Sequence, residues 1–95
     1  MGTSVQLTLL ENASATGNEF DWPGGAGEFA VEASSWAGTV ALHKMGPNGT
    51  YISLGQDVEL NANGFGCFFC GGGKLKAVVT GTVSEIYAAV KGLGE

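Results

Sequence analysis

The amino-acid sequence predicts an all-β protein, a small antiparallel β-sandwich or jelly-roll-like barrel of about eight short strands. Three observations support this prediction. Runs of alternating apolar and polar residues recur about every ten residues, as half-buried strands do. Seventeen glycines supply turns between the runs, and only 14% of the residues are charged. Apart from the small, polar and turn-forming residues 11–27, the gaps between the runs are too short for a crossover connection of about a dozen residues, so no βαβ unit can be placed.

The strands are expected where the alternation is clear. Residues 5–9 form the first run, and residues 28–33 form the second, with Phe29, Val31 and Ala33 pointing inward. The other six runs are residues 39–45, 51–54, 58–62, 65–70, 74–80 and 86–91. The last run also allows a short helix, because it is rich in alanine.

Two turns connect strands with well-defined chemistry. Gly46–Gly49 combines a proline that presets φ with an Asn-Gly pair that accepts positive φ. Residues 51–54 should therefore return antiparallel to residues 39–45 as a hairpin. Gly71–Gly73 should reverse the chain into residues 74–80, whose apolar side chains lie on one face and whose lysines lie on the other.

The chain is expected to form one sandwich domain, residues 1–95, because typical domains contain about 50 to 250 residues. Residues 11–27 are small, polar and turn-forming, apart from Phe20 and Trp22. They are expected to be a long surface loop or N-terminal arm segment, or an irregular edge strand. A core of this size leaves little material for a deep pocket, so we do not expect an enzyme.

Charge and hydropathy limit the classes of partner. Nine acidic residues against four lysines and no arginine give a net charge of −5. This balance disfavours nucleic acid, which is bound through clustered Lys and Arg, and it disfavours anionic membranes. Met1–Ser4 lacks the positive start of a signal peptide, and no apolar run is long enough to span a bilayer. We therefore expect synthesis in a cytoplasm and no membrane partner.

Cys67 and Cys70 form a C-x-x-C pair with three interpretations: buried small residues, a redox dithiol or half of a metal site. Zinc needs four ligands, and His43 is the only other strong ligand. In a strand, residues three apart face opposite sides, which disfavours the dithiol. His43 could serve as a base for Cys67 only if the fold brings the two together. We expect no metal, no cofactor and no catalytic site.

Two acidic pairs and two glycine clusters are weak indications of a calcium site and of a phosphate-binding loop. Glu19 with Asp21, and Asp57 with Glu59, could bind calcium, but neither pair lies in an EF-hand pattern. The glycines at residues 24–27 and 71–73 do not match a phosphate-binding loop. We expect solvated acidic faces and turns.

The aromatic residues suggest a binding surface. Phe20, Trp22 and Trp36 are the candidate contacts for a protein partner, because Trp22 lies in a polar, glycine-rich segment where its burial is least assured. The alternative is that Trp22 folds back as a lid over one end of the core. Stacking of a surface glycan on Trp22, Trp36 and Tyr51 is a competing function.

The order of these segments resembles small virion proteins of tailed bacteriophages, in particular capsid decoration (cement) proteins of the β-sandwich or jelly-roll type. The resemblance covers nearly the whole chain and rests on its pattern. It is carried by ENASATGNEFDWPGG, EFAVEASSWAGTVAL, GPNGTYISLG, KLKAVVTG and IYAAV.

This resemblance implies a structural virion protein on the capsid exterior, synthesised in the bacterial host cytoplasm. It implies a homotrimer that bridges neighbouring subunits of the major capsid protein and stabilises the shell. A carbohydrate-binding module on the phage exterior or on a fibre is the alternative. The resemblance implies no role for Cys67 and Cys70, in which this chain departs from the family.

Overall fold

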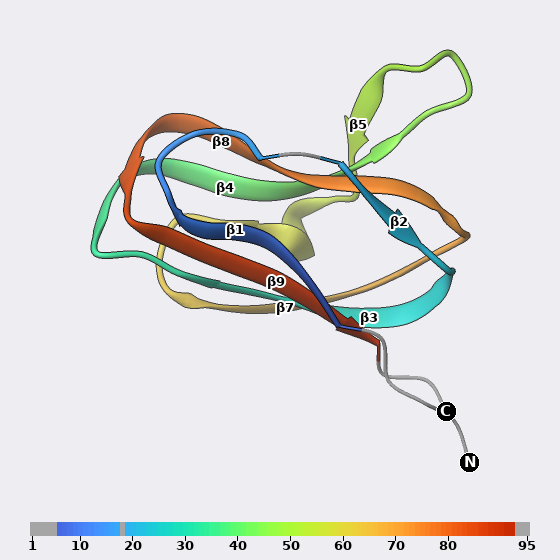
Figure 1. Ribbon diagram of the computed structural model, residues 1–95, viewed down its shortest axis with the longest axis horizontal. Helices are drawn as coiled ribbons and strands as arrows, with labels where there is room; N and C mark the ends of the chain where they lie inside the picture. The colour runs from blue at the N-terminus through green and yellow to red at the C-terminus, as the bar shows by residue number, and fades with distance from the viewer. Residues whose placement is uncertain (1–5, 18, 93–95) are drawn as a thin grey trace.

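Two antiparallel β-sheets packed face to face make up the computed structural model, which describes residues 6–17 and 19–92 (Figure 1). The described strands are β1 (Gln6–Ala13), β2 (Phe20–Trp22), β3 (Gly25–Glu32), β4 (Ser35–Met45), β5 (Tyr51–Ser53), β6 (Glu59–Leu60), β7 (Gly64–Cys70), β8 (Gly73–Ser84) and β9 (Ile86–Gly92). One sheet has the order β1-β9-β3-β7. The other has the order β2-β8-β4-β5, and β6 also pairs with β4. The predicted all-β antiparallel sandwich is confirmed.

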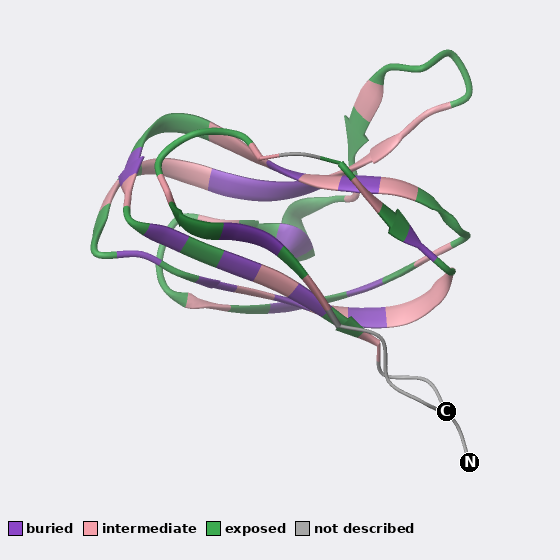
Figure 2. Cartoon of the chain, in the orientation of Figure 1, coloured by how far each residue is buried: buried purple, intermediate pink, exposed green. Residues whose placement is uncertain are grey.

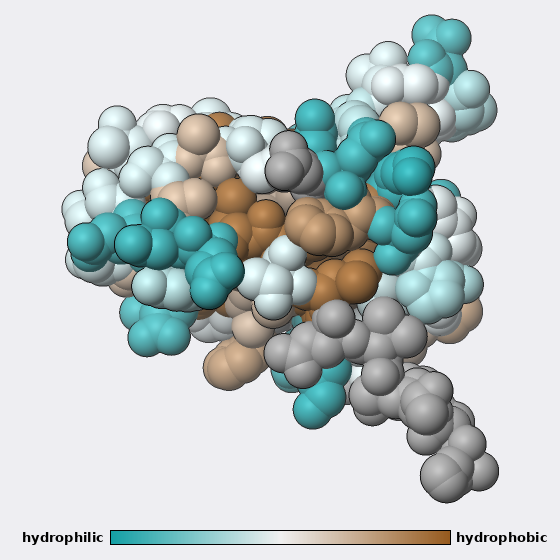
Figure 3. All heavy atoms as spheres, viewed as in Figure 1, coloured by the Kyte–Doolittle hydropathy of each residue, from teal (hydrophilic) through white to brown (hydrophobic). Residues whose placement is uncertain are grey.

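The core lies between the two sheets and follows the alternation of each strand. Buried bands alternate with exposed or intermediate bands along β9, and with intermediate bands along most of β3 (Figure 2). Phe29, Val31 and Ala33 point inward as predicted, with 0%, 3% and 8% of their surface exposed. Apolar residues gather at the middle of the side seen in Figure 3, between the sheets, and hydrophilic residues surround them. No helix in the described ranges is long and apolar enough to cross a membrane.

The predicted hairpin is confirmed and projects from the body of the sandwich (Figure 1). The turn is closed by two backbone hydrogen bonds: Gly46 N–H donates to Thr50 O at 2.7 Å, and Gly49 N–H donates to Gly46 O at 3.0 Å. Gly49 has φ +81°, the conformation that the Asn-Gly pair favours. We refer to residues 44–54 as the hairpin arm.

A single turn of 3₁₀ helix, η1 (Gln56–Val58), fills the side of the sandwich next to β7. Its Val58 is fully buried in the core. A Cβ atom on Gly66 of β7 would lie 1.8 Å from Asp57 O, so only glycine allows this approach. The strand predicted at residues 58–62 is consequently shortened to β6, since Val58 is needed in the core rather than in a ladder.

For residues 11–27, the expected long surface loop or arm requires correction, whereas the irregular edge strand given as the other possibility agrees with the structure. β1 continues to Ala13, β2 occupies Phe20–Trp22, and β3 begins at Gly25. β2 pairs with β8, and Thr16 Oγ1 accepts a 2.9 Å hydrogen bond from Val79 N–H on the same strand. The segment therefore covers the edge of β8 instead of forming a free loop or arm. Residues 1–5, which include the expected start of the first strand, lie outside the described ranges.

Candidate functional site

Large apolar side chains lie exposed mainly on the outer face of the four-stranded sheet. In the described residues, four large apolar side chains are exposed: Phe69 (80%), Phe65 (71%), Ile52 (55%) and Tyr87 (49%). Phe65 and Phe69 belong to β7, Tyr87 belongs to β9, and only Ile52 lies on the other sheet. Soluble monomers rarely expose large contiguous apolar patches, so this face is the candidate binding surface.

β7 is apolar on both of its faces. Phe65, Cys67 and Phe69 point outward, whereas Gly66 and Phe68 are buried. The alternation follows from the period of two along a strand. Phe68 points into the core, so Phe65 and Phe69, which are three and one residues away from it, point to the outer face. The sequence analysis did not select these residues as contacts. The sequence did contain a signal for an exposed apolar surface: β7 has no polar side chain on either face.

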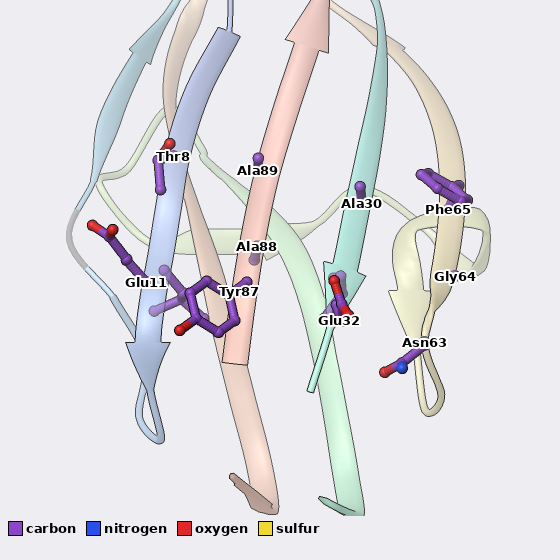
Figure 4. A pocket seen from close by; sticks show the side chains of 12 residues that line it. Thr8, Glu11, Ala30, Glu32, Asn63, Gly64, Phe65, Tyr87, Ala88 and Ala89 are labelled. Carbon is purple, nitrogen blue, oxygen red and sulfur yellow. The ribbon is translucent and has the colours of Figure 1, made fainter. Parts of the chain in front are cut away.

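A groove of about 610 Å³ crosses the same outer face. Its floor contains the small residues Ala30 and Ala89, which lie opposite each other on β3 and β9. Phe65 pairs with Ala30 on one side, and Thr8 pairs with Ala89 on the other. Figure 4 shows this arrangement, with short side chains between Phe65 and the ring of Tyr87. The groove is therefore shallow and apolar at its base, because its two central strands place the alanines Ala30 and Ala89 there.

Acceptor groups border the groove. Tyr87 lies between Glu11 of β1 and Glu32 of β3 in one cross-strand row, as the register and Figure 4 show. Asn63 lines the groove beside Phe65. The groove would therefore fit a ligand with an apolar centre and hydrogen-bond donors at its edges, since the carboxylates at the border accept hydrogen bonds.

Trp22 does not lie on the surface, and the expectation of an exposed Trp22 is corrected. Only 3% of its surface is exposed, and its ring centroid lies 5.1 Å from that of Phe68. A Cβ atom on Gly27 would lie 2.6 Å from the Phe68 ring and 2.9 Å from the Trp22 ring, so glycine at this position makes room for both rings. Trp22 therefore takes the alternative role, a lid over one end of the core.

The other two predicted contacts are half-buried. Phe20 packs against the core cluster from β2. Trp36 also packs against the core, and its Nε1 donates a 2.8 Å hydrogen bond to Asn63 Oδ1. Phe20 and Trp22 lie on β2 and Trp36 on β4, both in the sheet opposite the exposed aromatic face. The structure thus does not bring the three predicted residues together with Phe65, Phe69 and Tyr87.

The aromatic residues proposed to stack on a glycan do not form one platform. Trp22 is buried and Trp36 is half-buried. Tyr51 is covered by Lys76, whose Nζ lies 4.2 Å from the ring centroid, and its hydroxyl donates to Glu19. Partial burial, together with the hydrogen bond and charge of Glu19, raises the pKa of Tyr51 to about 12.

The two cysteines face opposite sides of β7, as predicted. Cys67 is exposed and Cys70 is half-buried against the core, and both are free thiols. Burial raises the pKa of Cys70, and the nearby Lys44 opposes that shift. His43 belongs to β4 in the other sheet, where burial lowers its pKa. The fold therefore separates the histidine from the outward-facing Cys67 and builds no Cys-His pair.

The acidic pairs are divided between different partners. Asp21 forms a 2.7 Å ion pair with Lys74, and that contact raises the pKa of the lysine. Glu19 accepts from Tyr51 instead. Among residues 6–17 and 19–92, no group of three or more His, Cys, Asp or Glu side chains is placed to hold a metal ion.

Comparison with known proteins gives a likeness of fold. No protein-family model matches the sequence, and no curated protein matches it. A solved structure titled "Crystal structure of SPBc2 prophage-derived protein YomS" superposes with a TM-score of 0.75. The two chains share 17% sequence identity, and the match covers 94% of this chain and 91% of that one. The chain is therefore similar in fold, over nearly its whole length, to a prophage-derived protein.

Proposed function

We propose that this chain is a structural virion protein of a tailed bacteriophage, one that binds the outside of the capsid. It would stabilise the shell by bridging neighbouring subunits of the major capsid protein, without catalysing a reaction. The observation that carries the proposal is the pair Phe65 and Phe69, which are 71% and 80% exposed on the outer face of the sheet. The likeness in fold to a prophage-derived protein supports a phage origin.

The physical basis is burial of apolar area over a broad, shallow surface. Removing apolar surface from water contributes roughly 25 cal/mol per Å², so two phenylalanine rings covered by a partner supply a useful share of a binding energy. Aromatic residues are enriched in interface cores. A flat sheet face suits the broad surface of a capsid subunit better than it suits a small substrate.

Shell stabilisation follows by mass action. A ligand that binds the assembled lattice and ignores loose subunits shifts the equilibrium toward the intact shell. Several copies in one oligomer, such as the expected homotrimer, increase the effective concentration of each contact. Individually weak contacts between this protein and the capsid are therefore enough to stabilise the shell.

The test is a binding assay on purified expanded capsids that lack this protein. The wild-type chain should sediment with the capsids and raise the temperature at which they release DNA. Phe69→Asp should lose binding, because it replaces the most exposed aromatic ring of this face with a charge. Thr82→Asp is the matched control, since it adds the same charge at an exposed position of the five-stranded sheet.

Thermal unfolding of both variants establishes that they fold. The proposal fails if wild-type protein does not bind the capsids, or if Phe69→Asp binds as tightly as Thr82→Asp. A substrate turned over by the purified chain would also contradict it.

A further inference from the structure

We propose that the groove on the four-stranded sheet receives the hairpin arm of a second copy of this chain, so that copies join head to tail in a ring. The inference rests on the proposed function for the expectation of an oligomer, and it deepens that function by assigning one surface to self-assembly. Phe65 lines the groove and would be covered by the arm, whereas Phe69 does not line it and stays exposed for the capsid.

The groove has the size and chemistry for the tip of a hairpin. Its volume of about 610 Å³ leaves room for several side chains of a turn. Its floor of Ala30 and Ala89 is apolar, and its border carries the carboxylates of Glu11 and Glu32. An occupant with an apolar centre, donor groups around it and no carboxylate would match this pattern.

The hairpin arm has this complementary pattern. Residues 45–54 contain no charged side chain, although the whole chain carries a net charge of −5. Pro47 is exposed at the tip, and Ile52 is 55% exposed on β5. Asn48 and Thr50 are exposed neighbours that can donate hydrogen bonds to carboxylates. The arm would therefore enter the acidic groove without charge repulsion.

The arm is held in a fixed direction at its base. Tyr51 lies beneath Lys76 of β8 and donates its hydroxyl hydrogen bond to Glu19. Leu54 N–H donates to Leu42 O of β4 at 3.1 Å. An arm that is already ordered before binding loses less conformational entropy when it binds, which favours association.

The positions of arm and groove make the contact head to tail. The groove lies on the four-stranded sheet near Glu32, where β3 leads into β4, whereas the arm leaves the far end of β4 on the other sheet (Figure 1). From Ser35 to Lys44, β4 extends about 30 Å at about 3.3 Å per residue. One chain cannot fill its own groove, so the occupant is the arm of another copy. The contact joins two different surfaces, and the homotrimer expected from the proposed function would close such contacts as a ring.

The first test measures the mass of the purified protein by light scattering, without capsids. The wild-type chain should form an oligomer of at least three times its 9.6 kDa. Ala30→Arg, which fills the groove from its floor, should dissociate it. Asn48→Asp keeps the turn, since Asp also favours it, but brings a carboxylate toward Glu11 and Glu32. Each change should weaken association by about tenfold or more.

Phe69→Asp is the control, because it adds a charge to the same sheet face outside the groove and should leave the oligomer unchanged. A disulfide trap in a Cys67→Ser background then tests the direction of the contact. Asn48→Cys protein mixed with Glu32→Cys protein should give covalent dimers on oxidation. A chain that carries both changes should give covalent rings.

The outcomes separate this inference from the proposed function. A monomeric wild-type protein that still binds capsids overturns the arm-in-groove contact alone. An oligomer that neither Ala30→Arg nor Asn48→Asp dissociates also overturns it. A third result has the same meaning: if the wild-type protein binds capsids as a monomer and Ala30→Arg releases it, the capsid protein occupies the groove instead of the arm. A ring that meets these expectations but does not bind capsids contradicts the proposed function alone.

Discussion

Asn63 Oδ1 accepts a 2.8 Å hydrogen bond from the indole nitrogen of Trp36. The same oxygen accepts a second 2.8 Å hydrogen bond from the backbone N–H of Ala33. Both donors are N–H groups, so the amide must turn its carbonyl toward them. Asn63 therefore ties the loop before β7 to the connection between β3 and β4.

We expect Asn63→Ala to lower the free energy of unfolding by about 0.5–1.5 kcal/mol, because it removes the acceptor of a part-buried backbone N–H and of an indole N–H near the surface. Urea denaturation followed by tryptophan fluorescence measures this loss. Asn63→Asp retains an acceptor and should cost less. Asn61→Ala, at an exposed position two residues earlier, should change stability by no more than about 0.5 kcal/mol. Equal losses for Asn61→Ala and Asn63→Ala would contradict the clamp.

The close approach of η1 to β7 predicts a second effect. Gly66→Ala places a methyl group where Asp57 O lies 1.8 Å away, so η1 must move and withdraw Val58 from the core. Overpacking of this kind costs about 1–3 kcal/mol or more. Thermal unfolding monitored by circular dichroism should show a lower midpoint.

Gly71→Ala is the matched control for this change. A Cβ atom on Gly71 meets nothing within 4 Å, and its φ lies outside the left-handed region. This variant should keep the wild-type midpoint or rise slightly, because alanine restricts the unfolded chain. If both alanines shift the midpoint equally, the contact of η1 with Gly66 does not stabilise the fold.

The alternation of side chains predicted the inward residues of β3 and β8 because it is a local property of each strand. It could not predict Val58, whose burial depends on a gap between sheets that only the assembled sandwich creates. Nor could it predict that Trp22 is buried, since the space for its ring is left by Gly27 on another strand. The groove was likewise invisible, because Ala30 and Ala89 become neighbours only through the register of β3 and β9.

Tyr51 predicts a pH dependence at the base of the hairpin arm. Its pKa is raised to about 12 in the folded protein from an ordinary value of 10.0, through burial and the carboxylate of Glu19. The folded state thus holds this proton more tightly than the unfolded state does. The contribution of Tyr51 to stability is complete below pH 10 and is lost as the pH rises toward about 12.

Ultraviolet titration in a Tyr87→Phe background, which leaves Tyr51 as the one tyrosine, follows this ionisation. Glu19→Gln removes the negative charge beside the phenol and should lower the pKa of Tyr51 toward its ordinary value. Glu11→Gln removes a carboxylate elsewhere and should leave the titration of Tyr51 unchanged. A Tyr51 titration that is identical in Glu19→Gln and in the background protein would rule out the hydrogen bond.

The two thiols should differ in reactivity toward a disulfide reagent at pH 8. Cys67 is exposed, whereas Cys70 is half-buried and burial raises its pKa, which lowers its thiolate fraction. Because the thiolate is the reacting species, the rate of Cys70 should be at least about tenfold lower than that of Cys67. Cys67→Ser and Cys70→Ser isolate the two rates, and denaturant should make them equal. Equal rates in the folded single variants, or rapid formation of a disulfide between the two thiols, would mean that β7 does not hold them on opposite faces.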